Sequence, residues 1–472
     1  MVTINVTNLV CNLKGDLKTL NRIREDFKFR HPNAYHIRQY MPRGWDGYIH
    51  VITEAGNMPT GYLPRFLEAI EKNGHPYRMI DNRNEFEPGE IPEEIRKFTM
   101  RGYQLEAIRA VVNNYIEGLY FPRGIISAAT NAGKTLIMAG IYASYPKTRG
   151  LILLNDSTLY DQFLTDMPKL FGSHWGYCRG KKIKWGRITV AMVQTLVKHL
   201  NEFNEELAMV DVLLVDECDL STSKTYKAVM KRVFNATVKV GLSGTVFIRN
   251  LAKDRVKNNS IIGNFGQELF KIKNLELMEK GFSTPVVIKI IRGNAFEPRA
   301  RDYEEIYKEC IVRNVRRNQM AVDRAKYYVA SETFPILVAC KLHEHVEIAF
   351  NLYKKTFWPK YRVDWVHGDR KDRAEVIEKF RAGEIDILVS SMIIKRGQNM
   401  PLIRVIQLLA GGDDPATPLQ LLGRGTRTDD SKEKFYFEDF LDMGEYVSRH
   451  AKHRIAYYKN EGFKIIDLLQ KF

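Results

Sequence analysis

Two series of short apolar runs shape the sequence, and stretches with helical spacing lie between the runs. Runs of this length without polar interruption suit strands buried on both faces, and the helical stretches supply the crossovers that a parallel sheet requires. The first series covers residues 124–129, 150–154, 188–193, 212–217 and 238–243, and the second covers 335–340, 361–368, 385–391, 405–410 and 434–440. The sequence therefore predicts an α/β protein with two tandem parallel-sheet domains.

Interruptions by proline and glycine separate three segments of the 472-residue chain. One interruption lies at residues 85–94, and a second lies at residues 277–290. A chain of this length is expected to form two or three domains, each large enough to bury a core. We predict a small α+β accessory or DNA-binding domain at residues 1–90. Parallel-sheet domains follow at 91–285 and 286–472, the second with a helical C-terminal tail.

The charge of the chain points to a polyanionic partner. Its formal net charge is +16 and its pI is about 9.4, which favours nucleic acid because each Lys or Arg that neutralises a phosphate releases a counterion. An anionic membrane is the rival partner, but the sequence has no apolar run of about 18 residues and no secretory pattern at its start. We expect a cytoplasmic protein, in the host cytoplasm if a phage encodes it. The five scattered cysteines predict reduced structural thiols.

A phosphate-binding loop is indicated by AATNAGKT, residues 128–135, between a predicted strand and an apolar helix. In such a Walker A loop, the backbone N–H groups and the helix dipole hold phosphates. Lys134 would reach the β- and γ-phosphates of ATP, and the Thr135 hydroxyl would bind Mg²⁺. The remaining loop residues predicted to bind the nucleotide are Thr130, Asn131, Ala132 and Gly133. Ala128 replaces the usual first glycine.

Two carboxylates end the apolar run VLLVDECD, residues 212–219. The C-terminal end of a buried parallel strand is where open α/β sheets bind ligands. Asp216 is predicted to hold Mg²⁺, and Glu217 to orient or deprotonate the attacking water. A third motif is QLLGRGTR, residues 420–427, in which Arg424 and Arg427 are three residues apart and would act as arginine fingers on the nucleotide of another domain.

Taken in order, these motifs resemble those of superfamily 2 helicases across residues 98–440. The resemblance implies two RecA-like domains with an ATPase site at their interface. It implies adenine recognition by Gln104, with Phe98 or Tyr103 nearby, and nucleotide contacts from Gly397 and Asn399. Asn399 stands where many relatives carry Asp. Ser243 and Thr245, together with Gln420, would couple hydrolysis to domain movement. Core packing is the alternative for Tyr103.

Polar residues after strands are the predicted nucleic-acid contacts within the motor. They resemble helicase segments that contact phosphate and sugar without reading sequence. These residues are Ser157, Thr158, Gln162, Gln194 and Thr195. Helix capping is the competing role for such side chains.

The N-terminal segment narrows the resemblance to the UvsW-like branch-migration helicases of phages. The matching pieces are EDFKF (residues 25–29), GWDGYIHV (44–51) and GYL (61–63), with a further match at residues 303–322. In the segment 35–48, Arg38, Arg43 and Trp45 would stack on bases or bind phosphate. In the segment 303–322, Arg313 and Arg317 would bind phosphate. The alternative for Trp45, Arg38 and Arg43 is a small domain's core with a basic rim. The alternative for Arg313 and Arg317 is a solvated helix face.

We therefore expect an ATP- and Mg²⁺-dependent DNA helicase or translocase that remodels Holliday junctions, forks and displacement loops in recombination and repair. The partner is DNA, no membrane is involved, and a monomer is compatible with the sequence. An RNA helicase and a restriction-type duplex translocase are the alternatives within the enzyme class. A nucleic-acid-binding protein without hydrolysis is the alternative from another class.

Overall fold

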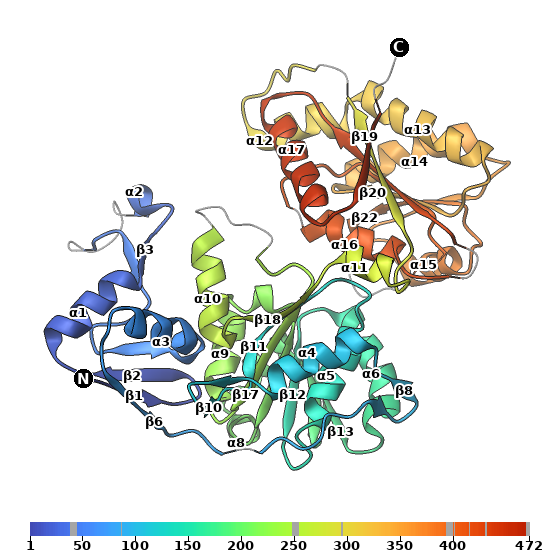
Figure 1. The fold of residues 1–472 in the computed structure, drawn as a ribbon. Helices are drawn as coiled ribbons and strands as arrows, with labels where there is room; N and C mark the ends of the chain where they lie inside the picture. The colour runs from blue at the N-terminus through green and yellow to red at the C-terminus, as the bar shows by residue number, and fades with distance from the viewer. Residues whose placement is uncertain are drawn as a thin grey trace. The chain divides into compact units, whose positions relative to one another are not determined.

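The computed structural model describes residues 1–37, 45–85, 87–247, 254–293, 296–392, 400, 402–414, 416–429 and 432–468. Its contacts divide the chain into two compact units. Unit 1 contains residues 1–128 and 133–271, and unit 2 contains residues 129–132 and 272–472. Each unit is built on a large, mainly parallel sheet with helices connecting its strands (Figure 1). This architecture confirms the predicted α/β fold class.

Unit 1 begins with a small mixed sheet in the strand order β5-β2-β1-β6. Its β1 pairs antiparallel with β2 and parallel with β6. Alternate residues of β1 are buried, and they share a core with the apolar side of α3, including Phe66 and Ile70. The elements are β1 (Val2–Val6), β2 (Val10–Lys14), α1 (Leu17–Asp26), β3 (Lys28–Arg30), α2 (Ala34–Ile37), β4 (Tyr48–His50), β5 (Asn57–Pro59), α3 (Leu63–Lys72) and β6 (Tyr77–Asp81).

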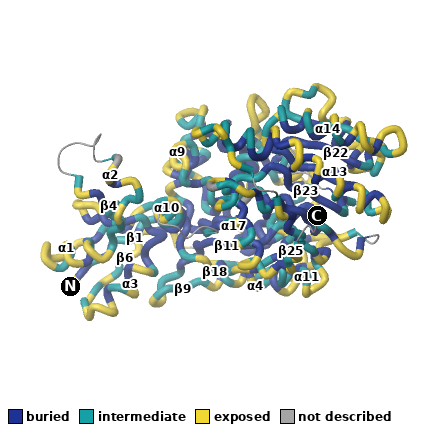
Figure 2. The backbone as a smooth tube through the Cα atoms, turned by 90° about the horizontal axis from the view of Figure 1, so that it is seen from above, coloured by how far each residue is buried: buried dark blue, intermediate teal, exposed yellow. Residues whose placement is uncertain are grey.

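The main sheet of unit 1 has the strand order β14-β13-β15-β12-β16-β17-β11-β18. Its strands are β11 (Arg123–Ala128), β12 (Gly150–Leu154), β13 (Trp175–Arg179), β14 (Lys182–Lys184), β15 (Ile188–Met192), β16 (Val212–Asp216), β17 (Val238–Ser243) and β18 (Glu268–Ile272). Every residue of β11, β12, β15, β16 and β17 is buried, as the apolar runs predicted. Figure 2 shows β11 as part of this buried interior.

Helices connect these parallel strands. They are α4 (Gly102–Val112), α5 (Lys134–Ala143), α6 (Ser157–Phe171), α7 (Val193–Leu196), α8 (Asn204–Ala208), α9 (Lys224–Arg232) and α10 (Arg255–Phe265). The β13–β14 hairpin was not predicted, because its short strands include half-buried and exposed residues and lack a continuous apolar run.

Unit 2 has a sheet in the order β21-β22-β20-β23-β24-β19-β25, and every adjacent pair is parallel. Its strands are β19 (Val286–Arg292), β20 (Ile336–Cys340), β21 (Val363–Val366), β22 (Ile387–Ser391), β23 (Val405–Leu408), β24 (Phe435–Leu441) and β25 (Lys464–Leu468). The helices are α11 (Asn274–Glu279), α12 (Tyr303–Tyr307), α13 (Val315–Ala330), α14 (His343–Phe357), α15 (Arg373–Arg381), α16 (Ala416–Gly425) and α17 (Glu445–Asn460).

The C-terminal region adds both a helix and a strand to unit 2. The predicted helical tail is α17, and β25 follows it and pairs in parallel with β19. Arg454 of α17 is buried against Asp439 of β24, with Nη2 of Arg454 2.8 Å from Oδ1 of Asp439. The tail is therefore an integral part of the sheet domain.

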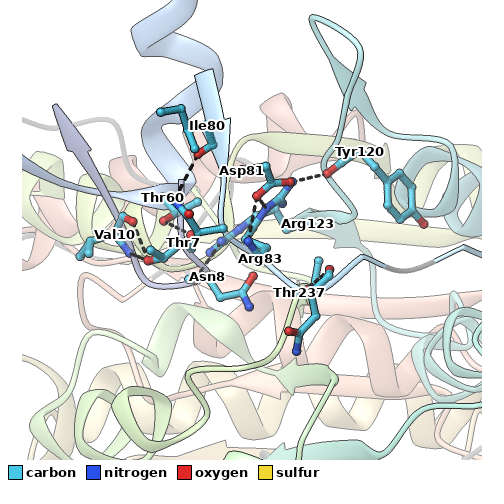
Figure 3. Close-up of polar contacts among 12 residues, drawn as sticks. Thr7, Asn8, Val10, Thr60, Ile80, Asp81, Arg83, Tyr120, Arg123 and Thr237 are labelled. Carbon is cyan, nitrogen blue, oxygen red and sulfur yellow. Dashed lines mark hydrogen bonds and ion pairs between the residues drawn. The ribbon is translucent and has the colours of Figure 1, made fainter. Parts of the chain in front are cut away.

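The small sheet docks on the main sheet of unit 1 through polar groups, most of them buried (Figure 3). Arg123, at the start of β11, donates to the carbonyl oxygens of Asn8 at 3.1 Å and of Asn264 at 2.8 Å. Nζ of Lys239 donates to the same Asn8 carbonyl at 3.1 Å. Arg83 pairs with Asp81 and donates to the Tyr120 carbonyl. We call these five residues, Asn8, Asp81, Arg83, Arg123 and Lys239, the docking cluster; it explains why the predicted first segment belongs to unit 1.

Among the residues that the structure describes, none of the helices combines the length and apolar composition that a membrane-spanning segment needs. The five cysteines are all buried and free, as expected for structural thiols.

Candidate active site

The predicted phosphate-binding loop connects the end of β11 to the start of α5. Gly133 caps α5 with a φ of 73°, and Asn131 has a φ of 77°. A Cβ atom at Gly133 would lie 2.5 Å from Nε2 of Gln104, so this position requires glycine for space as well as for conformation. The turn leaves the first N–H groups of α5 without partners in their own helix, which is the arrangement that holds phosphate groups.

Lys134 and two carboxylates meet at the C-terminal end of the sheet in unit 1. Nζ of Lys134 lies 3.4 Å from Oδ1 of Asp216 and 3.4 Å from Oε1 of Glu217. Asp216 is the last residue of β16, and its side chain is 5% exposed. Glu217 follows it with φ 50° and ψ 52°, a left-handed conformation that residues with side chains seldom adopt. The three residues predicted from separate motifs therefore form one cluster.

The charges in this cluster depend on one another. Burial opposes the charge on Lys134, but Asp216 and Glu217 outweigh it and raise the Lys134 pKa above its ordinary value. Burial raises the pKa of Asp216, an effect that Lys134 partly offsets and Glu217 increases. Lys134 is therefore a cation held between two carboxylates.

The donor set at Asp216 fits a divalent metal ion. Its Oδ1 is buried and, apart from the ion pair with Lys134, accepts no hydrogen bond from the residues described. Thr135, in the first turn of α5, supplies a partly exposed hydroxyl. A carboxylate and a hydroxyl beside a phosphate-binding loop are oxygen ligands of the kind that Mg²⁺ prefers.

Ser243 links the Glu217 carboxylate to a further acid. It is the last residue of β17, next to β16, and its Oγ lies 3.0 Å from Oε2 of Glu217 and 3.1 Å from Oδ1 of Asp219. A hydroxyl has one proton, so it donates to one of these carboxylates at a time. Burial and the nearby Glu217 charge raise the pKa of Asp219. Ser243 Oγ also accepts a hydrogen bond from the backbone N–H of Thr245 at 3.1 Å.

Asp219 was not singled out as a site residue from the sequence. The available signal was its place in VLLVDECD, but an acid two positions beyond Glu217 also suits a solvated turn. A short helical turn, Cys218–Leu220, brings its carboxylate back towards β17. Nζ of Lys257 lies 3.5 Å from the other Asp219 oxygen.

The predicted adenine-recognition segment lies beside the phosphate-binding loop. Gln104 is buried in the first turn of α4, and its Oε1 accepts the backbone N–H of Arg101 at 2.9 Å. Tyr103 is also buried and its hydroxyl accepts from Nη1 of Arg101 at 3.1 Å. Phe98 in β8 (Phe98–Thr99) is 40% exposed. The structure thus gives Gln104 a capping role, while base recognition by any of these residues stays a prediction.

The motif with two arginines forms the end of α16 in unit 2. Arg424 is buried in this helix, and Arg427 follows it with its backbone oxygen accepting from Thr284 Oγ1 at 3.0 Å. Nε of Arg427 and Oε1 of Gln420 are buried without hydrogen-bond partners among the residues described. Gly397 and Asn399 lie outside the described residues. Roles for these residues at the nucleotide stay predictions.

The predicted nucleic-acid contacts in unit 1 follow β12 and β15. Asp156 caps α6 by accepting from the N–H groups of Thr158 and Leu159, and Ser157 and Gln162 are exposed on the same helix. Gln194 donates from Nε2 to the Asn155 carbonyl at 2.9 Å, joining the two segments. Thr195 is buried, and its hydroxyl accepts the Gly180 N–H at 2.9 Å. Contacts with nucleic acid stay predictions for all five, and Thr195 has a structural role.

The remaining predicted nucleic-acid contacts are Arg38, Arg43, Trp45, Arg313 and Arg317. Arg38 and Arg43 lie outside the described residues. Trp45 is half-buried and donates from Nε1 to the Tyr48 carbonyl at 3.0 Å. Arg313 is exposed and pairs with Glu344 at 2.6 Å. Arg317 corrects our prediction: it is 1% exposed and pairs at 2.6 Å with buried Asp442, so it supports the core and not a phosphate contact.

Two family matches cover the elements that build these sites. Residues 97–248 match the family "Type III restriction enzyme, res subunit", and residues 321–429 match "Helicase conserved C-terminal domain". The first range contains the phosphate-binding loop, both carboxylates and Ser243, and the second contains Arg424 and Arg427. Together with the fold, these matches identify the chain as a superfamily 2 helicase, a nucleic-acid-dependent ATPase.

Within this class, the chain resembles the UvsW helicases of phages. It is 23% identical over 500 aligned residues to the ATP-dependent DNA helicase UvsW of Enterobacteria phage T4, with 95% of each chain covered. It is 25% identical over 366 residues to IRC3 of Saccharomyces cerevisiae, described as an ATP-dependent helicase, covering 72% of this chain. The chain spans about half (51%) of that yeast protein's length.

The fold of this chain is also similar to the fold of a solved structure. S. cerevisiae Dbp5 bound to RNA and ADP–BeF₃ has a TM-score of 0.52 and 15% sequence identity, covering 78% of this chain and 89% of its own. At this identity the likeness concerns the arrangement of helices and strands alone.

Proposed function

We propose that this helicase uses ATP hydrolysis to remodel branched DNA, including four-way junctions, forks and displacement loops. The ATPase activity in this proposal is supported by the cluster of Lys134, Asp216 and Glu217 beside a glycine-capped phosphate-binding loop. The branched substrate is supported by the resemblance to UvsW, which extends through the N-terminal segment as well as the motor.

The residues of unit 1 divide the work of hydrolysis. The N-terminal N–H groups of α5 and the Lys134 ammonium bind the β- and γ-phosphates of ATP. Thr135 and Asp216 would hold Mg²⁺, which when bound neutralises charge on the phosphate oxygens. Glu217 accepts a proton from, or orients, the attacking water, and Ser243 holds its carboxylate in place.

The nature of the nucleic acid distinguishes this proposal from its rivals. The wild-type protein would be compared with Lys134→Ala and Glu217→Gln in ATPase assays without nucleic acid and with single-stranded DNA, duplex, fork, four-way junction and RNA. Gel-resolved junction unwinding would accompany each assay. Lys147→Ala is a matched control, because Lys147 is an exposed lysine after the far end of α5.

We expect the four-way junction to stimulate wild-type hydrolysis most. Both active-site variants should lose about 100-fold or more of this rate, the scale of removing a group that stabilises the transition state, while Lys147→Ala keeps it. Stimulation by RNA alone would indicate an RNA helicase, and stimulation by plain duplex alone a duplex translocase. Wild-type protein without stimulated turnover would contradict the motor itself.

A further inference from the structure

A second group of polar side chains lies in unit 2 and includes none of the residues assigned above. His343 is the first residue of α14, and His367 and Asp369 follow the end of β21. One metal-ligating atom from each of the three lies within 4.8 Å of the others. Because α14 packs against the next element, β21, the start of the helix and the loop after the strand lie close together.

The two imidazole rings are stacked. Their centroids are 4.2 Å apart and their planes differ by 15°. Trp365 lies 4.8 Å from the His367 ring, so a large apolar side chain also packs against His367. The ring-nitrogen lone pairs lie in the ring planes, so the two nearly parallel rings must splay apart for both nitrogens to bind one ion beside Asp369.

Asp369 faces both rings. Its Oδ2 lies 3.2 Å from Nδ1 of His343 and 3.9 Å from Nδ1 of His367. The carboxylate is 79% exposed, so a solvated ion has access to it. The neighbouring Arg370 is paired with Asp364 and Asp372 and does not take the Asp369 carboxylate in the contacts described.

We propose that His343, His367 and Asp369 bind a divalent transition-metal ion such as Zn²⁺. Two imidazole nitrogens and one carboxylate oxygen form a common three-ligand set for such ions, which bind them at about 2.0–2.2 Å. In a tetrahedral site, neighbouring ligand atoms are about 3.3 Å apart, a separation that His343 and Asp369 already have. At His367, the metal replaces a 3.2 Å hydrogen bond from the Asp369 N–H to Nδ1.

The ion would join the start of α14 to the loop after β21. Both segments follow strands of the same parallel sheet, so the metal cross-links two connections at one edge of unit 2. A fourth coordination position stays open to water or to an anionic ligand. This site shares no residue with the Lys134 cluster, and the proposal does not depend on the proposed function.

The test is metal titration of tag-free protein stripped with a chelator, with millimolar Mg²⁺ present to occupy sites made of oxygen ligands. Zn²⁺ affinity and stoichiometry come from competition with a chromophoric chelator. Co²⁺ reports coordination through its visible absorption. His343→Ala, His367→Ala and Asp369→Asn would be compared with His199→Ala, because His199 is a partly exposed histidine paired with a single carboxylate, Glu202.

We expect one Zn²⁺ per chain, a tetrahedral Co²⁺ spectrum and a rise in the unfolding midpoint on adding Zn²⁺. Each histidine variant should weaken binding about 100-fold or more and remove the rise, while keeping the midpoint of the metal-free protein. His199→Ala should behave as wild type. The proposal is overturned if the wild type binds no Zn²⁺ at micromolar concentration, or if His343→Ala and His367→Ala keep the affinity and the Co²⁺ spectrum.

Discussion

Glu217 occupies a backbone position that directs its side chain to the site. Its left-handed φ of 50° turns the chain sharply after β16, so that Asp216 and Glu217 both reach Lys134 although side chains of consecutive strand residues point to opposite faces. Left-handed residues that are not glycine recur where function requires a special geometry. In this protein the turn brings the carboxylates of both Asp216 and Glu217 close to the Lys134 ammonium.

Ser243 positions Glu217 through a hydrogen bond that its hydroxyl can also give to Asp219. We predict that Ser243→Ala lowers the maximal ATPase rate about 10- to 100-fold, because a hydrogen bond to a charged group is worth about 1.5–3 kcal/mol and Glu217 loses its orientation. Steady-state kinetics would measure the rate. Ser144→Ala is the control, since Ser144 is also buried but donates only within α5, to the Gly140 carbonyl. An unchanged rate for Ser243→Ala would remove Ser243 from the catalytic arrangement.

The sequence identified most of this cluster because motifs mark residues that chemistry requires. Lys134, Asp216 and Glu217 follow strands in recognisable patterns, and the structure brings them together. The sequence could not reveal that Arg317 is buried, because its partner Asp442 follows the end of β24, 125 residues further along the chain. A basic cluster on a helix looks the same whether its arginines face water or a buried carboxylate.

The strands of both main sheets were predictable where they are buried on both faces. The runs that became β16, β17, β20 and β22 have no exposed residue. β25 was missed because it lies at a sheet edge and mixes exposed and half-buried residues. Burial on one side weakens the apolar signal that predicts a strand.

A buried lysine, Lys239, contributes to the docking of the small sheet on the main sheet of unit 1. Burial is the main cause that lowers the pKa of Lys239 well below its ordinary value of 10.5, and repulsion from Arg123 lowers it further. Between that lowered pKa and 10.5 the unfolded chain binds one more proton than the folded chain, so rising pH stabilises the folded state by up to about 1.4 kcal/mol per pH unit. We predict that Lys239→Met removes this slope.

The measurement is the denaturation midpoint of wild type and Lys239→Met from neutral pH towards pH 10. As the pH rises, the denaturation midpoint of the wild type should increase relative to that of Lys239→Met. Lys231→Met, at an exposed lysine of α9, should keep the wild-type dependence. Parallel curves for wild type and Lys239→Met would mean that the folded protein does not suppress the charge on Lys239.

At the scale of the whole molecule, the net charge of +16 predicts binding that depends strongly on salt. If about 6–10 phosphates are contacted, DNA affinity should fall about 10³- to 10⁵-fold between about 50 and 200 mM salt. Fluorescence anisotropy with a labelled duplex would give the slope. Arg313→Ala should reduce this slope by about one phosphate contact, whereas Lys147→Ala should not. An affinity independent of salt would contradict a phosphate-dominated interface.

The place of β19 in the sheet of unit 2 affects how the chain emerges during translation. Its two neighbours, β24 and β25, are the last strands of this sheet to be synthesised, so β19 leaves the ribosome with both hydrogen-bonding edges open. Unpaired strand edges promote aggregation. A ribosome that stalls before β24 would therefore hold a nascent chain with an apolar, unpaired strand, and a chaperone bound to β19 would have to release it only when the C-terminal strands arrive.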